Sequence, residues 1–184
     1  DFMYRGKTTY REYLIYPEQW SIDQNNFTLN LGVLRRYTYE KGVGTVSFDV
    51  RTPGIFTDFN YSYLELEAIN DNRLGKKLNL KTRYYGRFGT GDTPLESSLY
   101  LSGANPETLY DNKFTRAQGI VPQEWANYSN SSTGHFQQGG GLNLRGYNGY
   151  STFDSDSSIT YLGNSGTSIS MELEFQRLLP FKPK

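Results

Sequence analysis

The chain has 184 residues, enough for one domain with a sizeable core, and its 19 basic and 19 acidic residues cancel. The chain therefore has no overall positive charge that would attract a polyanion, and we expect no nucleic-acid partner. The absence of cysteine excludes disulfide frameworks and cysteine-ligated metal sites, and we expect no cofactor. No run of about 18 apolar residues is present, which a transmembrane helix would need.

The composition favours strands that are wet on one face and apolar on the other. Hydrophobic residues make up only 36%, whereas aromatic residues reach 16%, with 16 Tyr, 11 Phe and 19 Gly. Soluble β-sandwiches also use Tyr and Gly, but the balance favours a membrane β-barrel. The first residues, DFMYRGK, lack an initiating methionine and an apolar signal region. A mature secreted chain or a segment of a longer chain would begin in this way.

The first clear pattern is a period-two alternation over residues 27–39, which predicts a strand long enough to cross a bilayer when tilted. Tyr37 and Tyr39 at its end would lie in an interfacial aromatic girdle. A second strand is expected over 44–51, and the short connection 40–43 joins the two strands as a hairpin.

Residues 58–70 and 76–89 are expected to form a second hairpin around a turn at 70–75. Leucines would share one face of this hairpin, and charged side chains the other. The charged side chains are Glu65, Glu67, Lys77, Lys81, Arg83 and Arg87. In a soluble sandwich they form the solvated face, whereas in a barrel they line a wet lumen and the leucines meet lipid. The strand lengths favour the barrel.

The second half of the chain carries less regular patterning. After residue 89 the alternation is lost, and a strand with Glu172 and Glu174 on its polar face appears only near the end. The predicted parts of this single β-barrel segment (1–184) are two β-hairpins (27–89), a long loop region (90–135), a loop bearing an Arg-Gly-Tyr tip (136–165) and a transmembrane strand (166–177). No familiar catalytic or phosphate-binding motif is present, so we do not expect an enzyme.

Residues 136–147, FQQGGGLNLRGY, form the most informative stretch. Three glycines, which allow close backbone approach, precede the Arg-Gly-Tyr tip by a few residues. The residues in question are Gly139, Gly140 and Gly141, followed by Arg145, Gly146 and Tyr147. The arginine offers a planar, permanently charged set of donors suited to a carboxylate or a carbonyl cluster. By itself such a tripeptide is also common in surface turns.

The order of GGGLNLRGY, a polar loop and GTSISMELEFQRLLPF resembles the bacterial surface antigen family, the BamA-, TamA- and FhaC-type outer-membrane β-barrels. The resemblance covers about residues 136–181. It implies that a long extracellular loop folds back into the lumen and is locked there by its tip, Arg145, Gly146 and Tyr147. The glycine triplet would be the close-packed approach to that tip. The next strand ends in an acidic, aromatic and then proline-containing pattern, which Glu174, Phe175 and Pro180 match.

The resemblance implies an all-β, antiparallel transmembrane β-barrel in the outer membrane of a Gram-negative bacterium, acting in polypeptide insertion or translocation. Such barrels have sixteen strands, and the arginine docks on an aspartate-containing strand that this sequence lacks. We therefore expect a partial barrel, completed by further sequence or by another polypeptide. An eight-stranded barrel made by this chain alone is the competing interpretation. Implied partners are outer-membrane lipid, a polypeptide client and accessory outer-membrane or periplasmic proteins.

Two other functions are compatible with the same sequence. The first is a structural or anchoring barrel that belongs to a larger surface complex or to a periplasmic enzyme. Residues 99–110, LYLSGANPETLY, resemble barrels of Bacteroidetes-type bacteria, some of which are fused to a periplasmic peptidase. The second is a soluble β-sandwich that binds glycans through its tyrosines. Domains encoded upstream would distinguish a transport barrel from an anchoring barrel. Purification without detergent as a soluble protein would identify the β-sandwich.

Overall fold

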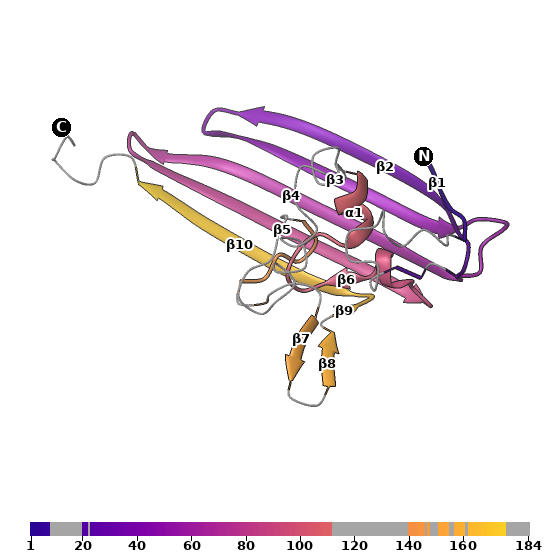
Figure 1. Cartoon of the computed structure of the whole chain (residues 1–184). Coiled ribbons are helices and arrows are strands. Elements are labelled where there is room, and N and C mark those ends of the chain that lie inside the picture. Colours follow the sequence, from indigo (N-terminus) through magenta and orange to yellow (C-terminus); the bar gives the residue numbers. More distant parts are fainter. Residues whose placement is uncertain are drawn as a thin grey trace, which may run out of the picture.

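The computed structural model describes residues 1–7, 20–21, 23–111, 140–145, 147, 151–154, 157–160 and 162–175. Its main feature is a six-stranded antiparallel sheet in the order β1-β2-β3-β4-β5-β10 (Figure 1). The strands are β1 (Phe2–Arg5), β2 (Asn26–Tyr39), β3 (Gly42–Pro53), β4 (Tyr61–Gly75), β5 (Leu78–Gly91) and β10 (Gly166–Phe175). The expected all-β class is confirmed, and in the described residues the sheet stays open, with β1 and β10 at its edges.

Short elements separate β5 from β10. They are the 3-10 helix η3 (Leu95–Ser97), β6 (Leu99–Tyr100), α1 (Pro106–Asp111), β7 (Ser151–Asp154), β8 (Ser157–Thr160) and β9 (Leu162–Gly163). Strand β6 pairs with β9, and β7 pairs with β8. Helix α1 begins where it does because Asn105 caps it. The Asn105 side-chain oxygen accepts a hydrogen bond from the Thr108 amide at 2.8 Å, and Pro106 has no amide hydrogen to leave unpaired.

The register of the main sheet separates apolar from polar side chains. Directly opposed residues of antiparallel strands project from the same face. Val33 therefore shares a face with Phe48 and Leu66, whereas Glu65 lies between Asp49 and Arg87 on the other. The apolar face carries Leu29, Leu31, Val33, Val46, Phe48, Val50, Leu64, Leu66, Phe88, Ile169, Met171, Leu173 and Phe175. The polar face carries Asp49, Arg51, Tyr63, Glu65, Glu67, Arg83, Tyr85 and Arg87.

The turn expected at residues 70–75 is wrong, because β4 continues through this segment to Gly75. Its asparagines, which are usual in turns, instead bond across strands here. Asn70 accepts a hydrogen bond from the Tyr37 hydroxyl at 2.6 Å, and Asn72 accepts one from Tyr39. The chain reverses only at residues 76–77, so Lys77 lies in a two-residue turn rather than on the charged face.

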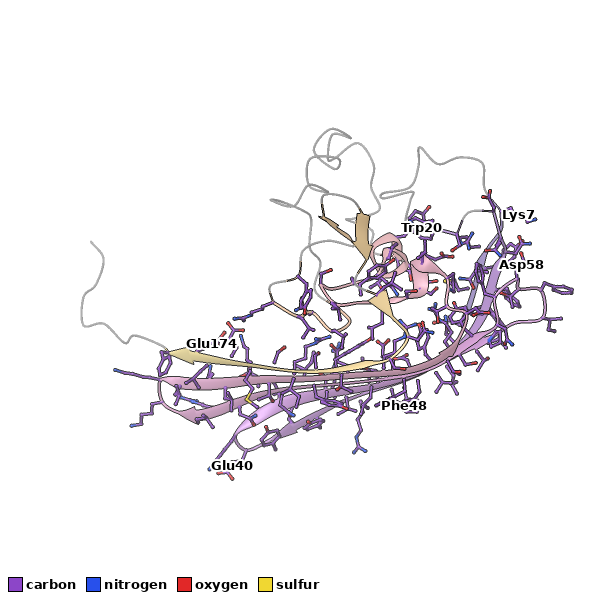
Figure 2. All side chains as sticks on the ribbon, turned by 90° about the horizontal axis from the view of Figure 1, so that it is seen from below. Lys7, Trp20, Glu40, Phe48, Asp58 and Glu174 are labelled. Atoms are coloured by element: carbon purple, nitrogen blue, oxygen red, sulfur yellow. The ribbon has the colours of Figure 1, made fainter. Side chains whose placement is uncertain are left out.

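The sheet is bowed, and elements between β5 and β10 lie over its concave side (Figure 2). We call residues 92–111 and 140–145 the cover. Phe48 projects from the opposite, convex side. Leu99 and Leu142 of the cover form a small apolar cluster with Tyr85 of the sheet. The rest of the contact between cover and sheet is polar, and it encloses the candidate site.

The end of β5 depends on a glycine. Gly91 has φ = +87°, a conformation that residues with a side chain rarely adopt, and an added Cβ would collide with the backbone of Asn60. We predict that Gly91→Ala lowers the free energy of unfolding by about 1–3 kcal/mol. The measurement is the denaturant unfolding midpoint. Gly75→Ala is the matched control, since nothing lies within 4 Å of its added Cβ; equal losses in both variants would contradict the prediction.

Candidate functional site: an arginine-rich polar cavity

A polar cavity of about 390 Å³ lies between the polar face of the sheet and the cover. Its walls come from β3, β4 and β5 on one side and from β6, α1 and Gly140–Gly141 (the glycine segment) on the other. Its charged lining includes Arg51, Glu65, Glu67, Arg83, Arg87 and Glu107. Hydrogen-bonding groups therefore surround the cavity on all of these elements.

Arg51 connects the sheet to helix α1. Its Nη1 atom lies 2.5 Å from the Glu107 carboxylate, and its Nε atom donates to the Asn30 side chain at 2.7 Å. Ser97 also donates to Glu107, at 3.2 Å. Burial raises the pKa of the Glu107 carboxyl, and the neighbouring Arg51 guanidinium opposes that shift. The pair thus holds α1 against the sheet, because either buried charge would be unfavourable without its partner.

Arg87 is the most deeply buried of these cations, with 2% of its surface exposed. Its guanidinium carbon lies 3.6 Å from the centre of the Tyr63 ring, a short cation–π contact. Its Nη2 atom donates to the Ser97 carbonyl at 2.7 Å. The end of η3 is therefore fixed to the middle of the sheet by an arginine of β5.

Glu96, which is fully buried, joins the first residues of the chain to the cover. Its carboxylate lies 2.5 Å from Arg5 and accepts hydrogen bonds from the Ser21 amide at 3.0 Å and from Asn26 at 3.4 Å. Three residues from the first 26 positions thus meet at the carboxylate of Glu96. Sequence reasoning missed Glu96 and Glu107 because they lie where strand alternation is lost; the surviving signal is that residues 92–111 contain acids but no basic residue.

Arg83 fixes the glycine segment to the sheet. Its Nε atom donates to Glu67 at 2.6 Å, and its Nη2 atom donates to the Gly141 carbonyl at 2.7 Å. Gly141 has φ = +51°, and an added Cβ there would lie 3.0 Å from the Gly103 carbonyl oxygen. Beyond it, the Leu144 amide donates to the Leu101 carbonyl at 2.8 Å. The backbone runs this close to residues 101–104 because glycine leaves the space empty.

The predicted loop tip lies directly after this docked segment. Arg145 is exposed, and none of the described hydrogen bonds or ion pairs involves it. Tyr147 is partly exposed and has an interaction of its own. Gly139 and Gly146 lie outside the described residues. Gly140 lies against Ala104, which its added Cβ would approach to 3.2 Å. The lock assigned to Arg145 therefore remains a prediction.

Apart from Lys77 in the turn, the charges predicted to line a lumen, which include Glu172 and Glu174, fall into two groups. Glu65, Glu67, Arg83 and Arg87 meet at the cavity. Lys81 and Glu174 form an ion pair further along the sheet, where both are roughly half exposed, and Glu172 lies opposite Lys81 in the register. Within the first group, Glu67 pairs with Arg83. The cavity is therefore only the covered half of a longer polar face.

The donors and acceptors around the cavity can bind polar or ionic groups. Within the described residues no cluster of His, Cys, Asp or Glu has the arrangement of a metal site. No helix among the described residues is long and apolar enough to span a membrane.

Neither a protein-family model, nor a curated protein, nor a solved structure matches this chain.

The buried Glu96 carboxylate can be tested against an exposed one. Breaking a buried ion pair leaves a desolvated charge, so we predict that Glu96→Gln lowers the free energy of unfolding by about 3–5 kcal/mol. Glu174→Gln removes an exposed carboxylate from an ion pair of the same sheet and should change the unfolding midpoint little. Denaturant titration measures both variants. Similar midpoints would show that the Glu96 contacts contribute no net stability.

Proposed function

We propose that this chain forms part of the wall of an outer-membrane β-barrel of the BamA-like class, which inserts or translocates polypeptides. Its apolar face would contact lipid, and its polar face would line the lumen. The cover would be the inward-folded part of an extracellular loop. One observation carries this proposal: among the described residues, the covered face of the sheet is the polar one and the open face is the apolar one, the reverse of a water-soluble protein.

A soluble sheet buries its apolar face and leaves its polar face to water. In this sheet the cover lies on the polar face, and the described residues leave the apolar face open. Leu31, Met171 and Ile169 of that face are 73%, 70% and 67% exposed. An apolar surface this continuous is unusual on a soluble monomer and fits contact with a bilayer or with a partner. A soluble glycan-binding sandwich would instead need a second sheet over these side chains.

The dimensions of the sheet support the membrane setting. Strands β2, β3, β4 and β5 have 14, 12, 15 and 14 residues, and a tilted strand needs about 9–11 to cross a bilayer. Aromatic side chains flank the apolar part of β2 at both ends. Phe27 stacks on Phe2 with ring centres 6.5 Å apart, and Tyr37 stacks on Tyr39 at 6.1 Å. Such aromatic ends are typical of strands that cross two interfaces.

Arg35 is the single charged side chain on the apolar face of the described six-stranded sheet. It precedes Tyr37 by two positions on the same face, near the end of β2. A long arginine side chain at this depth can extend its charge to the polar headgroups while its stem stays in the apolar layer. Its position is therefore compatible with the bilayer.

The edges of the sheet support a partial barrel. Strand β1 pairs with only four residues of β2, so the backbone of β2 from Leu31 to Tyr39 has a neighbour only in β3 among the described residues. The outer edge of β10 is likewise unpaired among them. Unpaired backbone groups are costly in lipid, so a strand must lie on each side in the assembled protein. We propose that further sequence or another polypeptide supplies these strands.

Single cysteines can test which face meets lipid, since the chain has none of its own. Nitroxide labels on Ile169→Cys, Met171→Cys and Leu173→Cys should be accessible to oxygen and protected from a water-soluble nickel complex in the full-length protein reconstituted in phospholipid vesicles. Labels on the neighbouring Ser170→Cys and Glu172→Cys, from the polar face, should show the opposite preference. Uniform access of the nickel complex to all five positions would overturn the bilayer proposal.

Arg145 can be tested as the lock of the inward loop. Charge-assisted hydrogen bonds contribute about 1.5–3 kcal/mol, so Arg145→Ala should lower the melting temperature of the folded protein by roughly 3–10 °C without loss of strand content. Arg36→Ala, which removes an exposed arginine from the open half of the polar face, is the control. Circular dichroism in detergent measures both quantities. A variant that melts like the parent would show that Arg145 locks nothing.

A further inference from the structure

The cover and the sheet beneath it have complementary charge. Residues 92–111 include four acidic residues (Asp92, Glu96, Glu107 and Asp111) and no lysine or arginine. The described charged contacts between cover and sheet all run in one direction, from an arginine of the sheet to an oxygen of the cover. They are Arg5 to Glu96, Arg51 to Glu107, Arg83 to the Gly141 carbonyl and Arg87 to the Ser97 carbonyl. The cover thus binds the sheet as an acidic polypeptide ligand would.

The arginines beneath the cover still have unused donors. In the described part of the chain, Arg87 Nε and Arg83 Nη1 are buried without a hydrogen-bond acceptor, and both arginines line the cavity. The cover gives each of these two cations only a backbone carbonyl. A carboxylate, which accepts from two guanidinium nitrogens at once, would satisfy more of these donors. The cavity beside them leaves room for such a group.

Acidic side chains on the same face limit how tightly an acidic ligand can bind. Asp49, Glu65 and Glu67 lie among the four arginines, so this half of the sheet has a formal charge of 4 − 3 = +1 without the cover. Removal of the cover would nevertheless leave Arg5 and Arg51 without their carboxylates. A segment that carries carboxylates could then pair with these two arginines in place of the cover.

We infer that the arginine-lined half of the polar face is a binding site for acidic polypeptide segments, which residues 92–111 occupy in cis. An acidic segment of a client displaces them by offering carboxylates to Arg5 and Arg51. This inference rests on the proposed function, because it takes the polar face to line the path of a polypeptide. It adds the chemical class of the client segment and a closed state maintained by the chain itself.

A synthetic peptide with the sequence of residues 92–111, labelled with a fluorophore, serves as the probe. Fluorescence anisotropy measures its binding to the full-length protein in detergent. While residues 92–111 occupy the site, a competing peptide binds only the molecules whose site is free. Its apparent affinity therefore falls in proportion to that free fraction. Glu107→Gln weakens the cis contact and leaves the arginines unchanged, so it should bind the peptide about tenfold more tightly than the parent does. Salt at about 0.5 M should weaken this binding.

Two matched controls make the result specific. Asp92→Asn removes an exposed carboxylate from the same segment, away from the described arginine contacts, and should leave the affinity at the parent value. A peptide with glutamine in place of both Glu96 and Glu107 should bind at least about tenfold more weakly. Circular dichroism verifies that Glu107→Gln keeps its strand content. Equal binding of the two peptides, or no gain from Glu107→Gln, would overturn the inference.

The bilayer proposal fails separately from this inference. Peptide binding is measured on the polar face, whereas the nitroxide measurement reports on the apolar face of β10. A sheet with peptide binding but without lipid access would retain the acidic-segment site and lose the membrane function. Lipid access without peptide binding would support the barrel and overturn the acidic-segment site.

Discussion

Pairs of arginine and carboxylate between the sheet and the cover are the interaction on which the rest of the structure depends. The sheet presents Arg51 and Arg87 on its concave side, and the cover presents Glu107 and the Ser97 carbonyl to them. Among the described residues, a small apolar cluster around Leu99 and Leu142 joins the two layers. Since the layers share little apolar contact, charge and hydrogen bonding must position the cover. Removal of one charged partner destabilises such an interface by leaving the other charge unpaired, whereas an apolar core contains no such pairs.

This arrangement follows from the pleat of the strands. Side chains alternate between faces at every residue, so one register sends the charged residues of β3, β4 and β5 to one side and the leucines to the other. A one-residue slip between β4 and β5 would bring Glu65 and Arg87 to opposite faces and leave both without the neighbours observed here. The ion pair between Arg83 and Glu67 and the contact of Arg87 with Tyr63 therefore stabilise the same register that exposes the apolar face.

The residues proposed to line the lumen also hold the cover on the sheet. The proposed lumen needs polar walls, and a polar wall is costly wherever it is closed off from water. The fold offsets that cost with Glu96 and Glu107, which come from the loop region rather than from the sheet. An acidic loop over an arginine-lined wall gives a closed state that needs no apolar seal. Under this proposal, opening the wall would exchange carboxylates rather than expose a hydrophobic core.

The long strands and their faces could be predicted from the sequence alone, because alternation is a local property of each residue and its next neighbours. Residues 27–39 and 166–177 were expected as strands, and β2 and β10 occupy almost the same positions. The turn expected at 70–75 was wrong because asparagines that favour turns locally bond to Tyr37 and Tyr39 across the sheet. The site, by contrast, depends on how the folded chain brings distant segments together. Arg5, Arg51, Glu96 and Glu107 come together through contacts between distant segments, and no local pattern records such contacts.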